Sequence, residues 1–324
     1  MKYAIATLMI AVSAAVSTGQ DMRPPHGFAR VTVRLVNGTA DGADVAGDSV
    51  KLTLYAQGQP VAVREGRADA EGKAVFENMV TGNGIAAAAQ ARHGDMSFGG
   101  AAFNLEPGKE TFETVVDVFE VSNDNTQLSV GAHHFILRAQ GNSLMVTEVM
   151  ELTNPTDRAI SSATRDAQGK PEVVRIHLPA GYRNFEVGEH FQANALVLTA
   201  DGFYDTMALP PGTFQAVFTY GLPITGEAVE ISKTMSMPVA DFAVFSQLPR
   251  GSIEGLGLPA GRIPGGDAEY FASAAYDAGH TLTFKVVGFK AEYSDARDIV
   301  ILSGIFAVVV LLGVWRLVRK PRAS

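Results

Sequence analysis

Apolar and polar residues alternate in short runs along most of this chain of 324 residues. Residues 31–35 and 281–286, for example, place every second side chain on an apolar face, and a period of two predicts β-strands that are buried on one face. Asn-Gly, Glu-Gly and Pro-Gly pairs separate such runs about every ten residues. This rhythm predicts an all-β protein built from antiparallel sheets, as a sandwich or a barrel.

The predicted strands fall into two groups. Residues 28–120 are expected to form a small N-terminal sandwich, and residues 128–288 a larger antiparallel β-domain. A polar stretch at residues 121–126 lies between them and marks the boundary. The pattern leaves open whether the larger domain is one sandwich or two packed sub-sheets.

Both ends of the chain have the features of membrane targeting. Residues 1–19 begin with a basic residue, continue with an apolar run and end with small residues, and this order predicts a secretory signal peptide. An uncleaved N-terminal anchor is the alternative. Residues 299–315 carry no charge and would extend about 25 Å as a helix. We therefore expect a transmembrane helix over residues 299–318, rather than a buried strand or core helix, with a juxtamembrane linker at residues 289–298.

The residues beyond this helix set its expected orientation. Residues 319–324 contain Arg319, Lys320 and Arg322, and such a basic cluster favours the cytoplasmic side of a membrane. The sequence therefore predicts a single-pass protein of a bacterial-type inner membrane. Its ectodomain would be periplasmic and its C-terminal tail cytoplasmic.

Composition excludes several functions. The chain has no cysteine, which rules out disulfides, thiolate metal sites, cysteine nucleophiles and c-type haem attachment. Five of the 26 Lys and Arg residues lie in the leader or the last nine positions, so the residues between carry 21 basic against 34 acidic groups. This body, with a formal charge of −13, repels nucleic acid and anionic lipid headgroups, so no nucleic-acid partner is expected.

The segments that carry a resemblance to a known family are residues 31–40, 48–52 and 67–76. They resemble the carboxypeptidase regulatory-like family, whose module is a transthyretin-like, immunoglobulin-like sandwich of seven strands. The resemblance implies that Asp69 closes a hairpin turn, Gly72 supplies a permissive backbone and Phe76 fills the core. It covers about a quarter of the chain and implies a structural or adhesive accessory role.

Segments at residues 115–120, 133–137 and 146–148 look like those of membrane-anchored bacterial proteins that carry this module. That second resemblance implies a place in cytochrome c biogenesis or envelope assembly. The chain itself has no haem-binding motif to support the former.

A hairpin predicted over residues 133–152 holds the main candidate site. With residues 140–142 as a three-residue loop, His134 would lie opposite Glu148. Glu148 shares its strand face with apolar residues, where a carboxylate needs a partner, and His134 would supply one. The pair predicts an ion pair that fixes strand register; the alternatives are a proton-sensing pair or part of a metal site. A two-residue loop would shift the register by one and abolish the pairing.

Two further hypotheses depend on other side chains. Met235 and Met237, with Met22 and His26 near the mature N-terminus, would suit Cu(I) because thioethers are soft ligands, although methionines on one strand face are more often core residues. Phe203 and Tyr204 would line an exposed edge that binds a glycan, whereas Phe214, Phe218 and Tyr220 alternate as on a core face. Motifs of serine hydrolases, zinc hydrolases and phosphate-binding loops are absent from the sequence.

These observations predict a membrane-anchored periplasmic binding or assembly accessory protein that acts by protein recognition, without catalysis and without a cofactor. Handling of copper or zinc through His134 and Glu148 is one alternative, and glycan binding is another. A periplasmic or membrane protein is the expected partner, in addition to the inner membrane itself.

Overall fold

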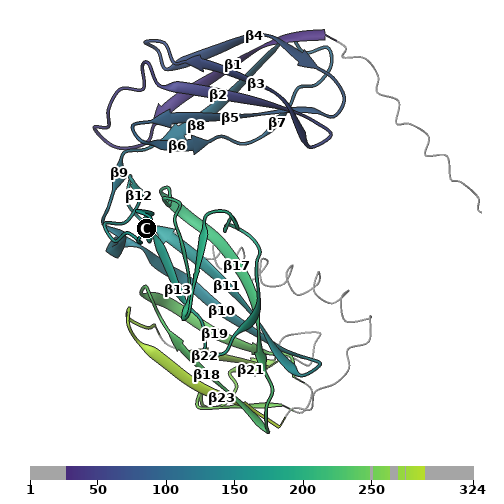
Figure 1. Ribbon diagram of the computed structural model, residues 1–324, viewed down its shortest axis with the longest axis vertical. Helices are drawn as coiled ribbons and strands as arrows, with labels where there is room; N and C mark the ends of the chain where they lie inside the picture. Colours follow the sequence, from purple (N-terminus) through teal and green to yellow (C-terminus); the bar gives the residue numbers. More distant parts are fainter. Residues whose placement is uncertain (1–26, 249–250, 263–268, 274, 289–324) are drawn as a thin grey trace, which may run out of the picture. The chain divides into compact units, whose positions relative to one another are not determined.

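The computed structural model describes residues 27–248, 251–262, 269–273 and 275–288 (Figure 1). These residues form an all-β structure of 23 strands with one 3-10 turn, η1 (Asn125–Gln127), as the alternating pattern predicts. Two predicted regions lie outside the described residues. They are the signal peptide at residues 1–19, and the linker, transmembrane helix and tail at residues 289–324. Within the described ranges, no helix has the length and apolar character needed to span a membrane.

The described residues divide into two compact units. The first contains residues 27–37 and 43–118, and the second contains residues 38–42 and those from 119 onward. The polar stretch that was expected between two domains belongs to the second unit, because its strand β9 (Val121–Ser122) pairs in parallel with β12 (Ala159–Ile160).

The first unit is a β-sandwich of two sheets (Figure 1). One sheet has the strand order β4-β1-β8, and the other has the order β3-β2-β5-β6 with β7 paired to β5. The described part of this unit has eight strands, one more than the family resemblance implies, and β7 is only two residues long. The strands are β1 (Gly27–Asn37), β2 (Ser49–Ala56), β3 (Gln59–Arg67), β4 (Lys73–Thr81), β5 (Ile85–His93), β6 (Met96–Gly99), β7 (Phe103–Asn104) and β8 (Thr111–Val118).

The turn between β3 and β4 has the geometry that its sequence predicts. Asp69 Oδ1 accepts hydrogen bonds from the backbone N–H groups of Glu71 and Lys73 at 3.0 and 2.8 Å. Gly72 has a φ of 73°, which glycine adopts without steric cost. Phe76 is buried in the core. All three predicted residue roles are confirmed, but the segment is not a hairpin, because β3 and β4 belong to different sheets.

The second unit uses the same turn. Asp166 Oδ1 accepts hydrogen bonds from the N–H groups of Gln168 and Lys170 at 2.9 and 2.8 Å, and Gly169 has a φ of 81°. Short Asp-x-x-Gly-Lys segments therefore form one kind of turn in both units, because the aspartate side chain replaces a backbone acceptor.

The second unit places a seven-stranded sheet against smaller sheets (Figure 1). The large sheet has the order β14-β17-β11-β10-β19-β22-β21, and the others are β13-β16-β15, β18-β23-β20 and β12-β9. Strands β10 and β19 of the large sheet pair in parallel, as β1 and β8 do in the first unit, so the expectation of purely antiparallel sheets is wrong. Buried residues from the large sheet and both three-stranded sheets form one hydrophobic cluster, so this unit has a single core. The remaining strands are β10 (Ser129–Gln140), β11 (Ser143–Asn154), β13 (Val174–His177), β14 (Arg183–Val187), β15 (Leu196–Thr199), β16 (Gly202–Asp205), β17 (Gly212–Pro223), β18 (Ala228–Thr234), β19 (Val239–Ser246), β20 (Ser252–Glu254), β21 (Gly261–Arg262), β22 (Glu269–Ser273) and β23 (Thr281–Val287).

Candidate functional site

The hairpin of β10 and β11 does not pair His134 with Glu148. Its loop contains two residues, Gly141 and Asn142, rather than three, so His134 lies opposite Val149. Because successive side chains of a strand point to opposite faces, this shift of one residue places His134 on the other face of the sheet from Glu148. The predicted pairing is therefore wrong, and with it the metal site built from these two side chains.

His133, rather than the predicted His134, contacts Glu148. Its Nε2 atom lies 2.7 Å from Oε2 of Glu148, and the two side chains are 1% and 0% exposed. A register shift between Val130 and His133 marks a β-bulge at the start of the pairing. The need of Glu148 for a buried partner was thus predicted correctly, and the partner was misplaced by one residue.

A lysine from the facing sheet completes this buried site. Lys233 lies on β18, and its Nζ atom donates hydrogen bonds to Glu148 Oε2 and to the backbone carbonyl of His177, both at 2.7 Å. Its side chain is 2% exposed. The sequence contained a signal for this contact, because Lys233 follows the buried Val229 and Ile231 at alternate positions of one strand.

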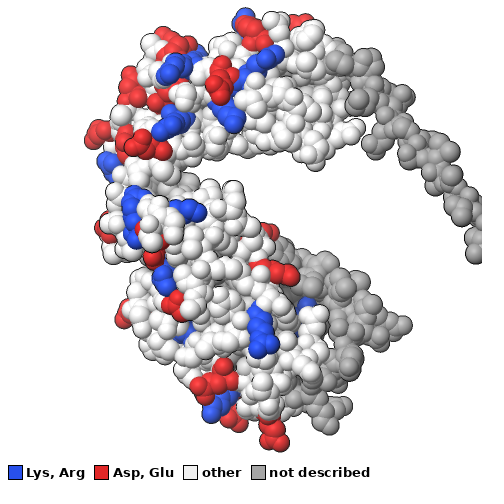
Figure 2. Space-filling view, in the orientation of Figure 1, with Lys and Arg blue, Asp and Glu red and all other residues white. Residues whose placement is uncertain are grey.

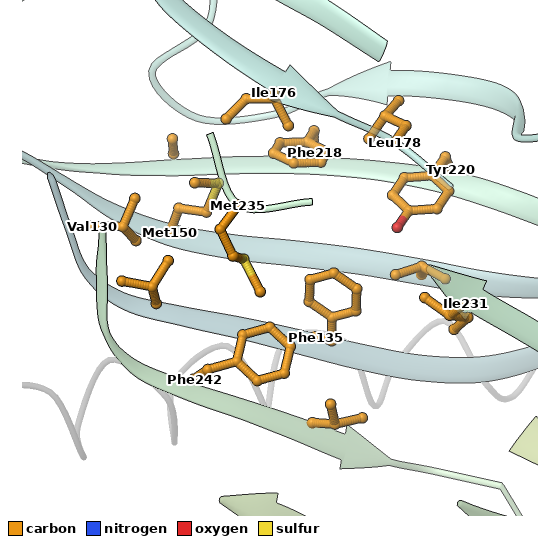
Figure 3. Packing of buried hydrophobic residues seen from close by; sticks show 14 of the residues in the cluster. Val130, Phe135, Met150, Ile176, Leu178, Phe218, Tyr220, Ile231, Met235 and Phe242 are labelled. Atoms are coloured by element: carbon orange, nitrogen blue, oxygen red, sulfur yellow. The ribbon is translucent and has the colours of Figure 1, made fainter. Parts of the chain in front are cut away.

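Aromatic side chains surround the ion pair. Phe135 and Phe218 lie opposite Glu148 on the two neighbouring strands, and the Lys233 ammonium is 5.6 and 5.7 Å from their ring centroids. Tyr220 donates a hydrogen bond of 2.8 Å to Glu148 Oε1. Figure 3 shows the hydroxyl of Tyr220 directed into the cluster that contains both phenyl rings. The cation is therefore held by a carboxylate, a carbonyl and two ring faces.

Burial and charge act against each other in this cluster. Burial raises the pKa of Glu148, but Lys233 and His133 together hold that pKa below its usual value, so the carboxyl is ionised. Burial lowers the pKa of His133 and of Lys233, and Glu148 offsets this only in part. The arrangement is a buried Glu–Lys ion pair with a neutral imidazole beside it.

The geometry does not fit a site for a hard metal ion. Within the ranges that the structure describes, no group of three His, Cys, Asp or Glu side chains could hold a metal ion. The Lys233 ammonium is bound at Glu148 Oε2, the oxygen that also contacts His133. The cluster therefore acts chemically as a satisfied ion pair in the core of the second unit.

The residues of the glycan hypothesis are buried. Phe203 is 0% exposed and Tyr204 is 3% exposed, and the Tyr204 hydroxyl donates to Asp166 Oδ2 at 2.7 Å. The expectation that they line an exposed edge is wrong. Phe218 and Tyr220, which alternate along β17, lie in the core as their spacing predicts, and Phe214 on the same strand is half-buried.

The first unit offers a different candidate, an exposed strand at the edge of a sheet. β3 lies at the end of the order β3-β2-β5-β6, and every residue of its nine except Gly66 is exposed (Figure 1). Val61 and Val63 are 59% and 46% exposed. Pro60, which has no N–H group, lies near one end of this strand, and the register with β2 shifts at Val61, so residues 62–67 form its regular part.

Charged side chains are dispersed over the face of the described residues that Figure 2 shows. Figure 2 shows basic and acidic side chains interspersed on the visible face of both units, with no continuous patch of either sign. That face therefore has no feature of an electrostatic nucleic-acid site.

Comparison with known proteins gives only distant matches. No family model matches the chain, and no characterised protein sequence matches it. Among solved structures, the major pilin SpaD of Corynebacterium diphtheriae matches 84% of this chain and 85% of its own at 8% identity, with a TM-score of 0.22. A DUF3823 family protein of Parabacteroides merdae matches 64% of this chain and 89% of its own at 11% identity, with a TM-score of 0.22. Scores this low carry no argument about function.

Proposed function

We propose that this chain is a membrane-anchored binding or assembly protein of the extracytoplasmic side of a bacterial-type inner membrane, which acts by protein recognition. The anchor and the orientation are those predicted from the uncharged run at residues 299–315 and the basic tail. The fold of the first unit would be the carboxypeptidase regulatory-like module. The partner would be a periplasmic or membrane protein, and the chain would have no catalytic step of its own.

The observation that carries this proposal is the exposure of β3. Edge strands of soluble domains are usually short or covered, because their free N–H and C=O groups accept strands of other proteins. Here the edge extends over nine residues and exposes two valines in its centre. An extended segment of a partner would add to the sheet beside residues 62–67, through backbone hydrogen bonds and apolar contacts with Val61 and Val63.

Site-specific photo-crosslinking in intact membranes tests this interaction. A photoreactive residue in place of Val63 should give one discrete adduct, which mass spectrometry identifies. The matched control carries the same residue in place of Val75, an exposed valine on β4 of the other sheet. The proposal predicts an adduct at position 63 that is absent at position 75.

A charge on the edge provides the second half of the test. Val61→Lys and Val63→Lys should each reduce binding of the purified partner, because a lysine has to be desolvated when a strand is added. Val75→Lys should leave binding unchanged. Equal adducts at positions 63 and 75, or full binding by both edge variants, would contradict recognition at β3.

A further inference from the structure

A small cavity lies beside the buried ion pair in the second unit. Its volume is about 10 Å³, enough for one water molecule or one small ion. Its lining includes His133 of β10, Met150 of β11, Lys233 of β18 and three residues of the segment before β19, which are Met235, Ser236 and Met237. His177, Thr234 and Ser236 are half-buried, so the cavity lies close to the surface.

One nitrogen of His133 has no hydrogen-bond partner among the described residues. Glu148 binds Nε2, and Nδ1 is buried without a partner. Phe135 and Phe242 contact the ring edge to face, with centroids at 5.1 and 5.5 Å, and so fix its orientation. Because Glu148 holds the proton on Nε2, the Nδ1 atom presents a lone pair at this cavity.

Three thioethers line the same cavity. Met150, Met235 and Met237 are 2%, 2% and 8% exposed. Figure 3 shows Met150 and Met235 entering the same part of the core from different chain segments. Methionine sulfur and a neutral imidazole are soft ligands, which select Cu(I) among the biological metal ions.

We propose that His133 Nδ1 and the thioethers of Met235, Met237 and Met150 form a binding site for one Cu(I) ion. This site differs from the predicted pair of His134 and Glu148, and it is independent of the recognition surface at β3. Glu148 would be a positioning residue: it holds the imidazole through Nε2, as carboxylates commonly do for metal-binding histidines.

The charges around the cavity favour a monovalent ion. Glu148 is the nearest buried anion, and Lys233 already balances it. A divalent ion such as Zn²⁺ would place two uncompensated charges in a buried site without a free carboxylate, whereas Cu(I) adds one and binds neutral sulfur well. Among the buried side-chain oxygens of the described cavity residues, only Ser236 Oγ is left without a hydrogen bond.

Anaerobic titration of the purified full-length chain with Cu(I), against a chromophoric Cu(I) chelator, tests the site. The wild type should bind one Cu(I) per chain, and X-ray absorption should show sulfur and nitrogen ligands together. Met235→Leu combined with Met237→Leu should weaken binding by about 10-fold or more, because it removes two ligands. Leucine keeps the volume of methionine closely enough for the core to remain folded.

The matched control is Met79→Leu, which removes a buried methionine of the first unit. It should leave the affinity unchanged. The proposal is overturned if the wild type binds no Cu(I) at one equivalent, or if the double variant, folded by circular dichroism, binds like the wild type. The first result would leave an ordered water molecule as the occupant, and the second would place copper elsewhere on the chain.

Discussion

Glu148 and Lys233 come from facing sheets of the second unit and meet with their charged atoms 2.7 Å apart. Both side chains are almost completely buried. Such a pair costs desolvation of two ions, and only full hydrogen bonding offsets that cost. Here His133, Tyr220 and the His177 carbonyl provide the remaining hydrogen bonds, so the two sheets are joined at one defined register.

The ion pair predicts a strong effect of removing one partner. Lys233→Met should reduce the free energy of unfolding of the second unit by about 3–5 kcal/mol, because it leaves an unpaired buried carboxylate. Urea unfolding monitored by circular dichroism measures this change.

A second variant separates the charge from the packing. Glu148→Gln combined with Lys233→Met removes both charges and keeps a hydrogen-bonding group for Tyr220 and His133. It should recover most of the stability lost in the single variant. A double variant that is less stable than Lys233→Met alone would show that the pair is not coupled as described.

Asp205 predicts a dependence of stability on pH. Burial raises its pKa from 3.8 to about 6, so the folded state holds a proton that the unfolded state has released. The stabilising contribution is complete below pH 3.8 and is lost as the pH rises to about 6. Over that window the free energy of unfolding of the second unit should fall by about 2–3 kcal/mol.

Asp205→Asn should abolish this component, and urea unfolding at pH 4 and pH 6 measures it. Asp201→Asn is the control: the pKa of the exposed Asp201 is lowered to about 2, first by the Thr199 hydroxyl, so its contribution is constant above pH 4. If the Asp205→Asn variant keeps the wild-type difference between the two pH values, then Asp205 is not the group responsible.

The two Asp-x-x-Gly-Lys turns predict different responses to the same substitution. Gly72 and Gly169 both have positive φ, so alanine should cost about 1–2 kcal/mol at either position. A Cβ atom at Gly72 would also lie 3.0 Å from Val45 and 3.1 Å from the Leu35 carbonyl, whereas none of the described atoms lies within 4 Å at Gly169. Gly72→Ala should therefore lower the unfolding midpoint of the first unit by more than Gly169→Ala lowers the unfolding midpoint of the second unit. Calorimetry measures both midpoints. Equal effects would contradict the contact at Gly72.

Local patterns predicted the fold well. Alternation predicted the all-β class, and the spacing of Phe218 and Tyr220 predicted their burial. The turn at Asp69 was predictable because its hydrogen bonds join residues that are at most four positions apart in sequence.

The site was less predictable because it depends on register and on long-range contacts. One residue of loop length decides whether His133 or His134 meets Glu148, and residues 140–142 are compatible with either loop. Lys233 is 85 residues from Glu148 in sequence, and only the packing of two sheets brings them together. Phe203 and Tyr204 were misjudged for the same reason: polar neighbours surround them in sequence, while the fold covers them.

Amide hydrogen exchange of β3 tests the central claim, recognition of a partner by strand addition, most directly. The purified full-length chain is compared with its complex with the partner identified by crosslinking. The account predicts that the amides of residues 62–67 which exchange freely in the isolated chain become protected in the complex, while those of β4 do not change. Unchanged exchange along β3, with protection elsewhere on the chain, would contradict it.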